Sequence, residues 1–327
     1  MHGEPRLSLA ETLGWTREAL GQAWLTLRGD PNVPPSRFGL SSTRIYTPRL
    51  AIATWAGRRP TGRRVPIVNL FNHTQTPVEQ GWSVRCTQVR DFRGQRMTYD
   101  SHNGTDFALP PGSPVTVSAP GRVVAIRNEY NRGGLKVYVD HGGGLLTTYN
   151  HLGRSLVRVG DLVGRGDVIA LSAYSGIDAL AAFPFVAPHI HYNVALGGVL
   201  VDPFAGSPAE TPIWRDDSGI PAPHRGGSEP FAQQDRTRFD PADVDRLLDD
   251  LLPDDRRRAL GREPDVDLRG WGLVIEATIY PTRFRSPEAG RIAFGGRECA
   301  RRSTLDLPVS ADFADGVCFA DDLGLRR

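Results

Sequence analysis

The chain has 327 residues, a hydrophobic fraction of 39%, 26 Pro, 36 Gly and a formal net charge of +2. This composition excludes a disordered chain, because enough apolar surface is present to form a core, and the small net charge argues against a nucleic-acid-binding protein. We expect a loop-rich, mainly β protein with one main core and appended segments.

The cysteines and the N-terminus give little indication of disulfides or export. Cys86, Cys299 and Cys318 have no metal-ligand spacing, and we favour buried, unpaired thiols, with Cys299–Cys318 as the one pair open to an exported chain. Charged residues interrupt every apolar run near the N-terminus, so no signal peptide is predicted. No run reaches the roughly 18 apolar residues of a membrane span. The oligomeric state and the export route stay open.

Residues 1–63 are predicted to be an N-terminal helix followed by a wrapping connection. Ser8 and Glu11 have the spacing of a capping box, which starts a helix predicted over residues 8–28. Apolar residues recur along it at helical intervals, and we expect this stripe, which includes Trp24, to pack in the core.

Short runs rich in β-branched and aromatic residues indicate strands over much of residues 64–205. Gly and Pro turns separate these runs at intervals typical of antiparallel sheets. The predicted strands, one of them in the preceding connection, are 50–55, 65–71, 81–89, 115–117, 121–127, 135–140, 145–149 and 167–171. Residues 64–205 are therefore predicted to form the main β domain.

Residues 206–327 are predicted to be an α+β accessory segment of unknown role. Asp240 as N-cap and Pro241 at the first helical position start a helix whose apolar residues follow the i, i+3, i+4, i+7 pattern, and Pro253 ends it. A strand is predicted at 271–280.

Five side chains able to bind or assist a metal lie in three fragments of the central stretch. The fragments are S-H-N-G-T-D, T-Y-N-H-L and P-H-I-H-Y, and the residues are His102, Asp106, His151, His189 and His191. Two imidazoles two residues apart on a strand point to the same face. Two or three neutral imidazoles with one carboxylate, and with room for water, are the ligand set of a catalytic zinc. Each motif alone arises often by chance, so the prediction depends on their order and on the glycine and proline framework around them.

That framework resembles a known family. Residues 99–204 resemble the catalytic domain of the lysostaphin-type zinc endopeptidases, also called LytM-like or β-lytic metallopeptidases. The matching text includes H-N-G-T-D-F-A-L-P-P-G-S-P-V, V-D-H-G-G-G-L-L-T-T-Y-N-H-L, P-H-I-H-Y and V-D-P-F. The resemblance implies an antiparallel β-sheet cleft of the duplicated hybrid (barrel-sandwich) type. It also implies hydrolysis of peptide bonds in bacterial peptidoglycan, in the cell wall, the periplasm or outside the cell.

The resemblance also implies a role for each of the five residues. His102, Asp106 and His191 match the ligands of one zinc ion per chain, with the fourth position open to water. His151 and His189 match two catalytic histidines that are not ligands. One would orient or deprotonate the water and the other would assist proton transfer to the leaving amine, and the assignment between them stays open.

The sequence departs from the family pattern at two places. The segment before P-H-I-H-Y is longer and more apolar, with Phe183 and Phe185, and is expected either to shape or cover the cleft or to pack on the accessory segments. Tyr192-Asn193 replaces the usual Phe-Glu and is expected to change the contacts around the ligands. Tyr149, predicted on the same face as His151, either contacts substrate or packs.

Parts of the sequence also resemble two other classes of protein. A non-catalytic LytM-like cell-wall-binding or regulatory module is the main alternative, and the presence of both His151 and His189 favours an enzyme over it. A lipoyl or biotinyl carrier requires a lysine at an exposed hairpin tip, and Lys136, the only lysine, lies in a predicted strand. His73 and His141 are assigned to the surface and to a turn.

Overall fold

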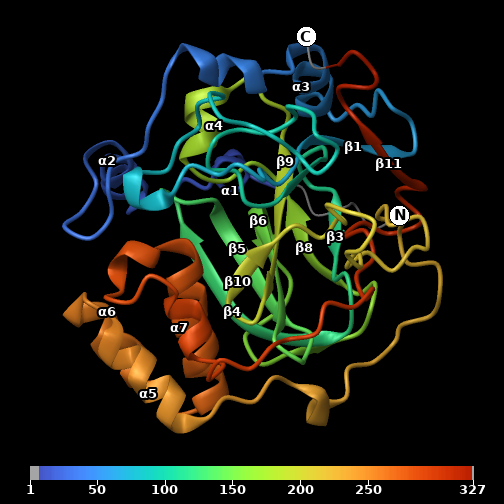
Figure 1. The fold of residues 1–327 in the computed structure, drawn as a ribbon. Helices are drawn as coiled ribbons and strands as arrows, with labels where there is room; N and C mark the ends of the chain where they lie inside the picture. The colour runs from blue at the N-terminus through green and yellow to red at the C-terminus, as the bar shows by residue number, and fades with distance from the viewer. Residues whose placement is uncertain (1–6, 326–327) are drawn as a thin grey trace.

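One large sheet forms the centre of the molecule (Figure 1). A computed structural model of the chain describes residues 7–325, apart from the side chains of Leu180 and Ala181. Within those residues the sheet has 11 strands in the order β11-β1-β2-β9-β6-β5-β4-β7, with β10 paired to β9, and β8 paired to β3 and β6. The strands are β1 Arg64–Asn69, β2 Thr105–Ala108, β3 Pro114–Thr116, β4 Gly121–Glu129, β5 Gly134–Asp140, β6 Leu145–Ser155, β7 Leu162–Val163, β8 Val168–Ser172, β9 His189–Leu196, β10 Val199–Val201 and β11 Gly316–Phe319.

The pairing is antiparallel except at one edge, where β11 joins β1 in parallel. The prediction of a mainly β, antiparallel protein is confirmed in this coarse form. The duplicated barrel-sandwich arrangement stays a prediction, and so does the division of the chain at residues 63 and 205.

The central strands have apolar partners on both faces. On β5, Val137 and Val139 point into the main core, whereas Tyr138 between them belongs to a second apolar cluster. This follows from the two-residue period of a strand, which sends alternate side chains to opposite faces. A strand with both faces covered is rich in apolar residues throughout, as the sequence L-K-V-Y-V-D largely is.

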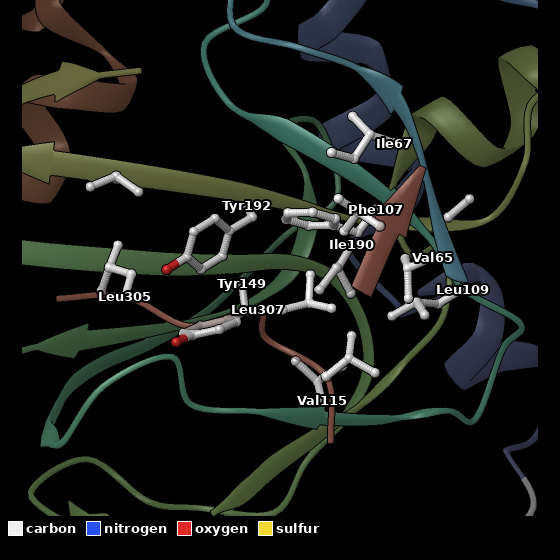
Figure 2. Close-up of a cluster of buried hydrophobic side chains, with 14 of the residues drawn as sticks. Val65, Ile67, Phe107, Leu109, Val115, Tyr149, Ile190, Tyr192, Leu305 and Leu307 are labelled. Carbon is white, nitrogen blue, oxygen red and sulfur yellow. The ribbon is translucent and has the colours of Figure 1, made fainter. Parts of the chain in front are cut away.

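The main core combines side chains that lie far apart in the sequence (Figure 2). Phe107 on β2, Tyr149 on β6 and Tyr192 on β9 pack together with Leu305 and Leu307 from the C-terminal segment, and all five are buried. The C-terminal segment therefore contributes to the same hydrophobic core as the central strands.

The helices gather in two groups (Figure 1). The helices are α1 Leu9–Leu13, α2 Ala19–Arg28, α3 Pro48–Trp55, α4 Ile177–Ala182, α5 Pro241–Asp250, α6 Asp254–Gly261, α7 Val266–Ile279 and α8 Ala289–Ile292. Apolar residues of α5, α7 and α8 pack on the face of the sheet that carries Tyr138. Residues of α3 and of the N-terminal segment pack with α4 at the other end of the molecule. None of the helices within residues 7–325 is both long and apolar enough to cross a bilayer.

Helix ends signalled by side-chain caps were predicted correctly. Ser8 and Glu11 form the capping box, and the Asp240 side chain accepts a hydrogen bond from the backbone N–H of Ala242 at the start of α5. The single helix predicted over residues 8–28 is wrong, because Gly14 ends α1 in the left-handed conformation (φ 70°) and a new helix starts at Ala19.

Three strand predictions were also wrong. Residues 50–55 lie in α3, and residues 271–280 lie mostly in α7, where Asp265 accepts hydrogen bonds from the N–H groups of Asp267 and Leu268. Both segments are short and apolar, a pattern that buried helices and strands share. Residues 81–89 form an irregular loop, whose N–H groups at Thr87 and Gln88 donate to the carboxylate of Asp100 instead of to a strand.

The apolar stripe of the first predicted helix does not pack in the core. Leu20 is 84% exposed and Trp24 is 58% exposed on α2. Of the cysteines, Cys299 and Cys318 are both free thiols, and Cys86 is buried.

The buried Trp214 tests whether the C-terminal segment is part of the core. Its ring stacks on Tyr192 with 5.7 Å between centroids and meets Phe204 edge-on at 5.6 Å. Trp214→Ala should lower the free energy of unfolding by about 3–5 kcal/mol, because it leaves a large cavity, and a urea titration measures the change. The exposed Trp24→Ala should change stability by less than about 0.5 kcal/mol. Equal effects of the two variants would contradict this account of the core.

Candidate metal centre

The register of three strands brings the predicted site residues together. In the β2–β9 pair, Asp106 lies opposite His191 and Ala108 lies opposite His189. In the β6–β9 pair, Asn150 lies opposite His191, which places His151 at the same end of the sheet. His102 comes from the turn that leads into β2. Gly104 in this turn has no room for a side chain, since a Cβ there would lie 2.6 Å from the Tyr192 carbonyl oxygen and 2.9 Å from His191 Nε2.

Three of the five residues form a compact cluster of possible metal ligands. His191 Nδ1 lies 2.7 Å from Asp106 Oδ1, and His102 Nε2 lies 3.0 Å from that oxygen and 3.1 Å from His191 Nδ1. The three residues are at most 7% exposed, and within residues 7–325 they are the one group of His, Cys, Asp or Glu whose ligand atoms converge in this way.

Hydrogen bonds behind the cluster hold each donor atom in position. His102 Nδ1 donates to the Leu70 carbonyl oxygen at 2.7 Å, which leaves the Nε2 lone pair facing the cluster. Asp106 Oδ2 accepts from Asn69 Nδ2 at 2.8 Å. His191 Nε2 lies 3.2 Å from Asn103 Oδ1 and 3.0 Å from Asn193 Nδ2, and in the tautomer that donates from Nε2 to Asn103 Oδ1 the Nδ1 atom is free as a ligand. Such outer contacts are what orients metal ligands in proteins.

The electrostatics of the cluster suit a cation. Burial alone would raise the pKa of Asp106, but the neighbouring imidazoles of His102 and His189 outweigh burial and hold the pKa well below its usual value. Burial lowers the pKa of His191. The environment therefore favours an ionised Asp106 carboxylate and a neutral His191 imidazole, which are forms that bind metal.

The ligand set fits zinc in chemistry and in spacing. Two imidazole nitrogens and one carboxylate oxygen are ligands that Zn²⁺ accepts, and atoms bound tetrahedrally at about 2.0–2.1 Å lie roughly 3.3 Å apart. The separations in the cluster, 2.7–3.1 Å, approach that value. A small outward adjustment of the three side chains would accommodate the ion.

His151 and His189 stand beside the cluster with one nitrogen uncommitted. Their Nδ1 atoms are each 2.8 Å from a backbone carbonyl oxygen, that of Ser175 for His151 and that of Ala187 for His189. His189 Nε2 lies 3.6 Å from Asp106 Oδ2. The ring centroids of His151 and His189 are 5.1 Å apart. Burial and the neighbouring His189 lower the pKa of His151 well below its usual value, so its ring is neutral at neutral pH.

A β-bulge aims His151 at the site. Between the pairs Leu135–Leu152 and Val137–Tyr149, β6 has one more residue than β5. His151 has a φ of +60°, and its backbone N–H donates to the Gly133 carbonyl oxygen at 2.8 Å. Bulges interrupt the alternation of a strand and redirect a side chain.

Because of this bulge, the expectation that Tyr149 shares the face of His151 is wrong. Tyr149 is fully buried and its hydroxyl accepts a hydrogen bond from the Ser118 backbone N–H, so it packs in the core.

Sequence reasoning missed several residues around the centre. Tyr174 packs on both His151 and His189, with ring centroids 5.2 and 4.9 Å away, and Tyr99 packs on His102 at 4.5 Å. No motif marks these tyrosines. Asn193 is at the predicted departure from the family pattern, and its Nδ2 atom lies 2.8 Å from the Asn103 carbonyl oxygen and 3.0 Å from His191 Nε2.

The remaining residues weighed from the sequence lie outside the centre. His73 forms an ion pair with Asp202 at 2.7 Å, and His141 sits in the turn after β5, where its ring contacts the Pro120 carbonyl oxygen and Thr147. Lys136 lies in a strand, β5, as predicted, and its side chain is buried.

A cavity of about 300 Å³ opens beside the centre, and we call it the cleft. Its wall includes His151, His191 and Asn103 from the central region. Other parts of the wall come from the accessory segments, namely Thr26, Leu27, Ser36, Phe38, Thr278 and Ile279. Both accessory segments therefore border the space next to the candidate metal centre.

The long segment before β9 does both things that were expected of it. Ile177 and Asp178 of α4 line the cleft. Phe183 meets Trp55 edge-on at 5.1 Å and Phe185 stacks near Tyr46, so the rest of the segment packs on the N-terminal residues.

The part of the chain that contains the candidate metal centre is similar to known proteins. Residues 100–203 match the model of Peptidase family M23. Peptidoglycan DD-endopeptidase ShyA of Vibrio cholerae serotype O1 is 41% identical over 123 residues, which are 37% of this chain and 27% of ShyA. Peptidoglycan DD-endopeptidase ShyB of the same organism is 38% identical over 101 residues, which are 31% of this chain and 22% of ShyB.

A solved structure, that of a zinc-containing peptidase from Vibrio cholerae, is 30% identical and covers 44% of this chain and 39% of its own, with a TM-score of 0.31. The chain spans about a quarter of the length of the curated relatives that it matches.

Proposed function

Residues 100–203 form a Peptidase family M23 domain, and we propose that this domain makes the chain a zinc-dependent endopeptidase acting on peptide bonds of bacterial peptidoglycan. The curated relatives named above are peptidoglycan DD-endopeptidases, which supports this substrate. The resemblance found in residues 99–204 of the sequence is thereby confirmed at the level of the family.

In this proposal His102, Asp106 and His191 hold one zinc ion per chain. The preset donor atoms described above support this assignment. A zinc ion held by three protein ligands acts as a Lewis acid toward a water molecule and the carbonyl group of a substrate.

His151 and His189 carry the proton transfers. With Nδ1 donating to a backbone carbonyl oxygen, each ring presents the lone pair of Nε2 to the side of the site. A neutral imidazole in that tautomer can take a proton from an attacking water, and in its protonated form can donate to the leaving amine or stabilise a developing oxyanion. Which histidine performs which transfer stays open.

The observation that carries the proposal is the pairing of these two histidines with the ligand cluster at the edge of the cleft. A regulatory or binding module needs the fold, with or without the metal, but it does not need two buried imidazoles whose Nε2 atoms face the site. No hydrogen bond within residues 7–325 engages either Nε2 atom, and buried titratable groups next to a charged partner, as His189 is next to Asp106, are typical of catalytic sites.

Removal of a ligand should abolish metal binding. His102→Ala and Asp106→Ala should each lose most bound zinc, because two ligands bind it far more weakly than three. Metal analysis of the purified proteins measures this. His73→Ala, which alters a histidine outside the cluster, should keep one zinc per chain. Full zinc content in folded Asp106→Ala would mean that the metal is held elsewhere.

Removal of a proton-transfer group should spare the metal. His151→Ala and His189→Ala should keep zinc and lose turnover by about 10²-fold or more, as expected for general acid–base groups. Zinc content and turnover are measured on the same preparation. Unchanged turnover in His151→Ala would refute the role assigned to that residue.

Purified peptidoglycan tests the reaction itself. Incubation with the zinc-loaded protein should release soluble peptide-containing fragments, and a zinc chelator should prevent their release. Mass spectrometry of the fragments identifies the bond that is cut. Absence of products from protein shown to contain zinc would favour the non-catalytic cell-wall-binding or regulatory module.

A further inference from the structure

One cation in the wall of the cleft has no acidic partner. Arg132 lines the cleft, yet among residues 7–325 no Asp or Glu oxygen lies within 4.0 Å of its guanidinium group. The other buried cations nearby each bind an acidic side chain, in the pairs Lys136–Glu129, Arg127–Glu276 and Arg283–Glu276. The fold therefore pairs the cations around Arg132 with carboxylates and leaves this one without an ion pair at that distance.

The backbone holds Arg132 close to a proposed catalytic histidine. Arg132 lies in the turn between β4 and β5, and the carbonyl oxygen of the next residue, Gly133, accepts the backbone N–H of His151 at 2.8 Å. Gly133 and Gly134 both have left-handed φ values, 75° and 64°, which a glycine pair adopts without strain. The position of the turn is thus coupled to the bulge that aims His151.

Two aromatic rings, one from residues 64–99 and one from the C-terminal accessory segment, lie next to the guanidinium group. Its carbon lies 4.8 Å from the centroid of Trp82 and 5.8 Å from that of Tyr280. Both residues lie outside residues 100–203, one before and one after. A guanidinium group stacked on a ring keeps its N–H groups directed sideways in its own plane, where they can meet a carboxylate with two parallel hydrogen bonds.

Other polar groups of the cleft also lack partners. Arg132 Nε, the Tyr138 hydroxyl and Asn150 Oδ1 are buried and make no hydrogen bond, and all three residues line the cleft. Tyr138 is 2% exposed and Asn150 is 5% exposed. Buried polar groups normally have partners. Two donors and one acceptor left unpaired in one wall suit a ligand that carries both an anionic oxygen and an N–H group, as a peptide does.

Asp178 is the acidic residue of the cleft that interacts with Arg132 electrostatically, but it forms no ion pair with it. It lies in the first turn of α4 and lines the cleft, and its oxygens are beyond ion-pair distance of the guanidinium group. Burial raises the pKa of Asp178, and the positive charges of His189 and Arg132 only partly oppose this rise.

We propose that Arg132 binds a free carboxylate of the substrate peptide and so selects acidic peptides next to the bond that is cut. The inference rests on the proposed peptidase function and deepens it by naming the chemistry recognised at the cleft. The carboxylate is either the C-terminus of a peptide stem or a side-chain carboxylate, since an arginine binds both in the same way.

The test compares cross-linked peptidoglycan fragments in two forms, with free carboxylates and with the carboxylates converted to amides. Wild-type protein should prefer the free form by about tenfold or more in kcat/KM, as expected for a charge-assisted bidentate contact. Arg132→Gln should lose this preference through KM, with kcat nearly unchanged and with full zinc content. Arg132→Lys should fall between the two, because lysine keeps the charge and lacks the planar fork.

Arg122→Gln is the matched control. Arg122 is on β4, the strand that precedes the Arg132 turn, but it pairs with Asp265 and does not line the cleft. It should behave as wild type. Fragments amidated only at the C-terminus or only at a side chain then identify which carboxylate is bound, because just one of them should lose the preference.

Binding separates this inference from the proposed function. Calorimetric titration of the same two fragment forms is run on His151→Ala and on His151→Ala with Arg132→Gln. If wild-type protein cuts neither form, the proposed function fails, yet carboxylate-dependent binding that Arg132→Gln removes still supports the inference. The inference is overturned if the protein prefers free-carboxylate fragments equally with and without Arg132. It is also overturned if Arg132→Gln loses binding of both fragment forms equally and loses zinc as well.

Discussion

The register between β2 and β9 is the constraint on which the candidate centre depends. It sets Asp106 opposite His191, and β6 on the other side of β9 brings His151 to the same edge. Because side chains on a strand alternate with a period of two, a slip of one residue would send His191 and His189 to the opposite face. The buried aromatic residues of the same strands, Phe107 and Tyr192, oppose that slip, since it would turn them out of the core.

At this edge of the sheet, specific hydrogen bonds compensate for the burial of polar side chains. The site residues are almost inaccessible to solvent, so their polar atoms need partners within the protein. The Nδ1–H groups of three histidines donate to the carbonyl oxygens of Leu70, Ser175 and Ala187. Fixed tautomers keep the inner nitrogens available without reorganisation, which is how protein sites prepare for metal binding and proton transfer.

The accessory segments complete the cleft and support its charged wall. Burial would raise the pKa of Glu129, but Lys136 and Arg127 lower it to about 2, so a charged network persists between the sheet and α7. The same end of α7 leads to Tyr280, which with Trp82 of the N-terminal half borders Arg132. Several segments far apart in the sequence therefore form the wall of the cleft, and no short motif predicts that they meet there.

The sequence by itself determined the candidate residues and the capped helix ends. Three short fragments, their order and the glycine and proline framework around them mark His102, Asp106, His151, His189 and His191, and all five meet in the structure. Caps such as Asp240 are local, because the side chain bonds a backbone group two residues away. These features depend on neighbours in the chain, so the amino-acid order is enough to reveal them.

Only the tertiary structure decided the rest. Short apolar segments became helices at α3 and α7 because burial against the sheet, not periodicity, sets their state, and the stripe with Trp24 stayed exposed because no element covers it among residues 7–325. The bulge that aims His151 and the rings around Arg132 join residues far apart in the chain. Such contacts depend on which surfaces meet after folding, and a local sequence pattern does not predict them.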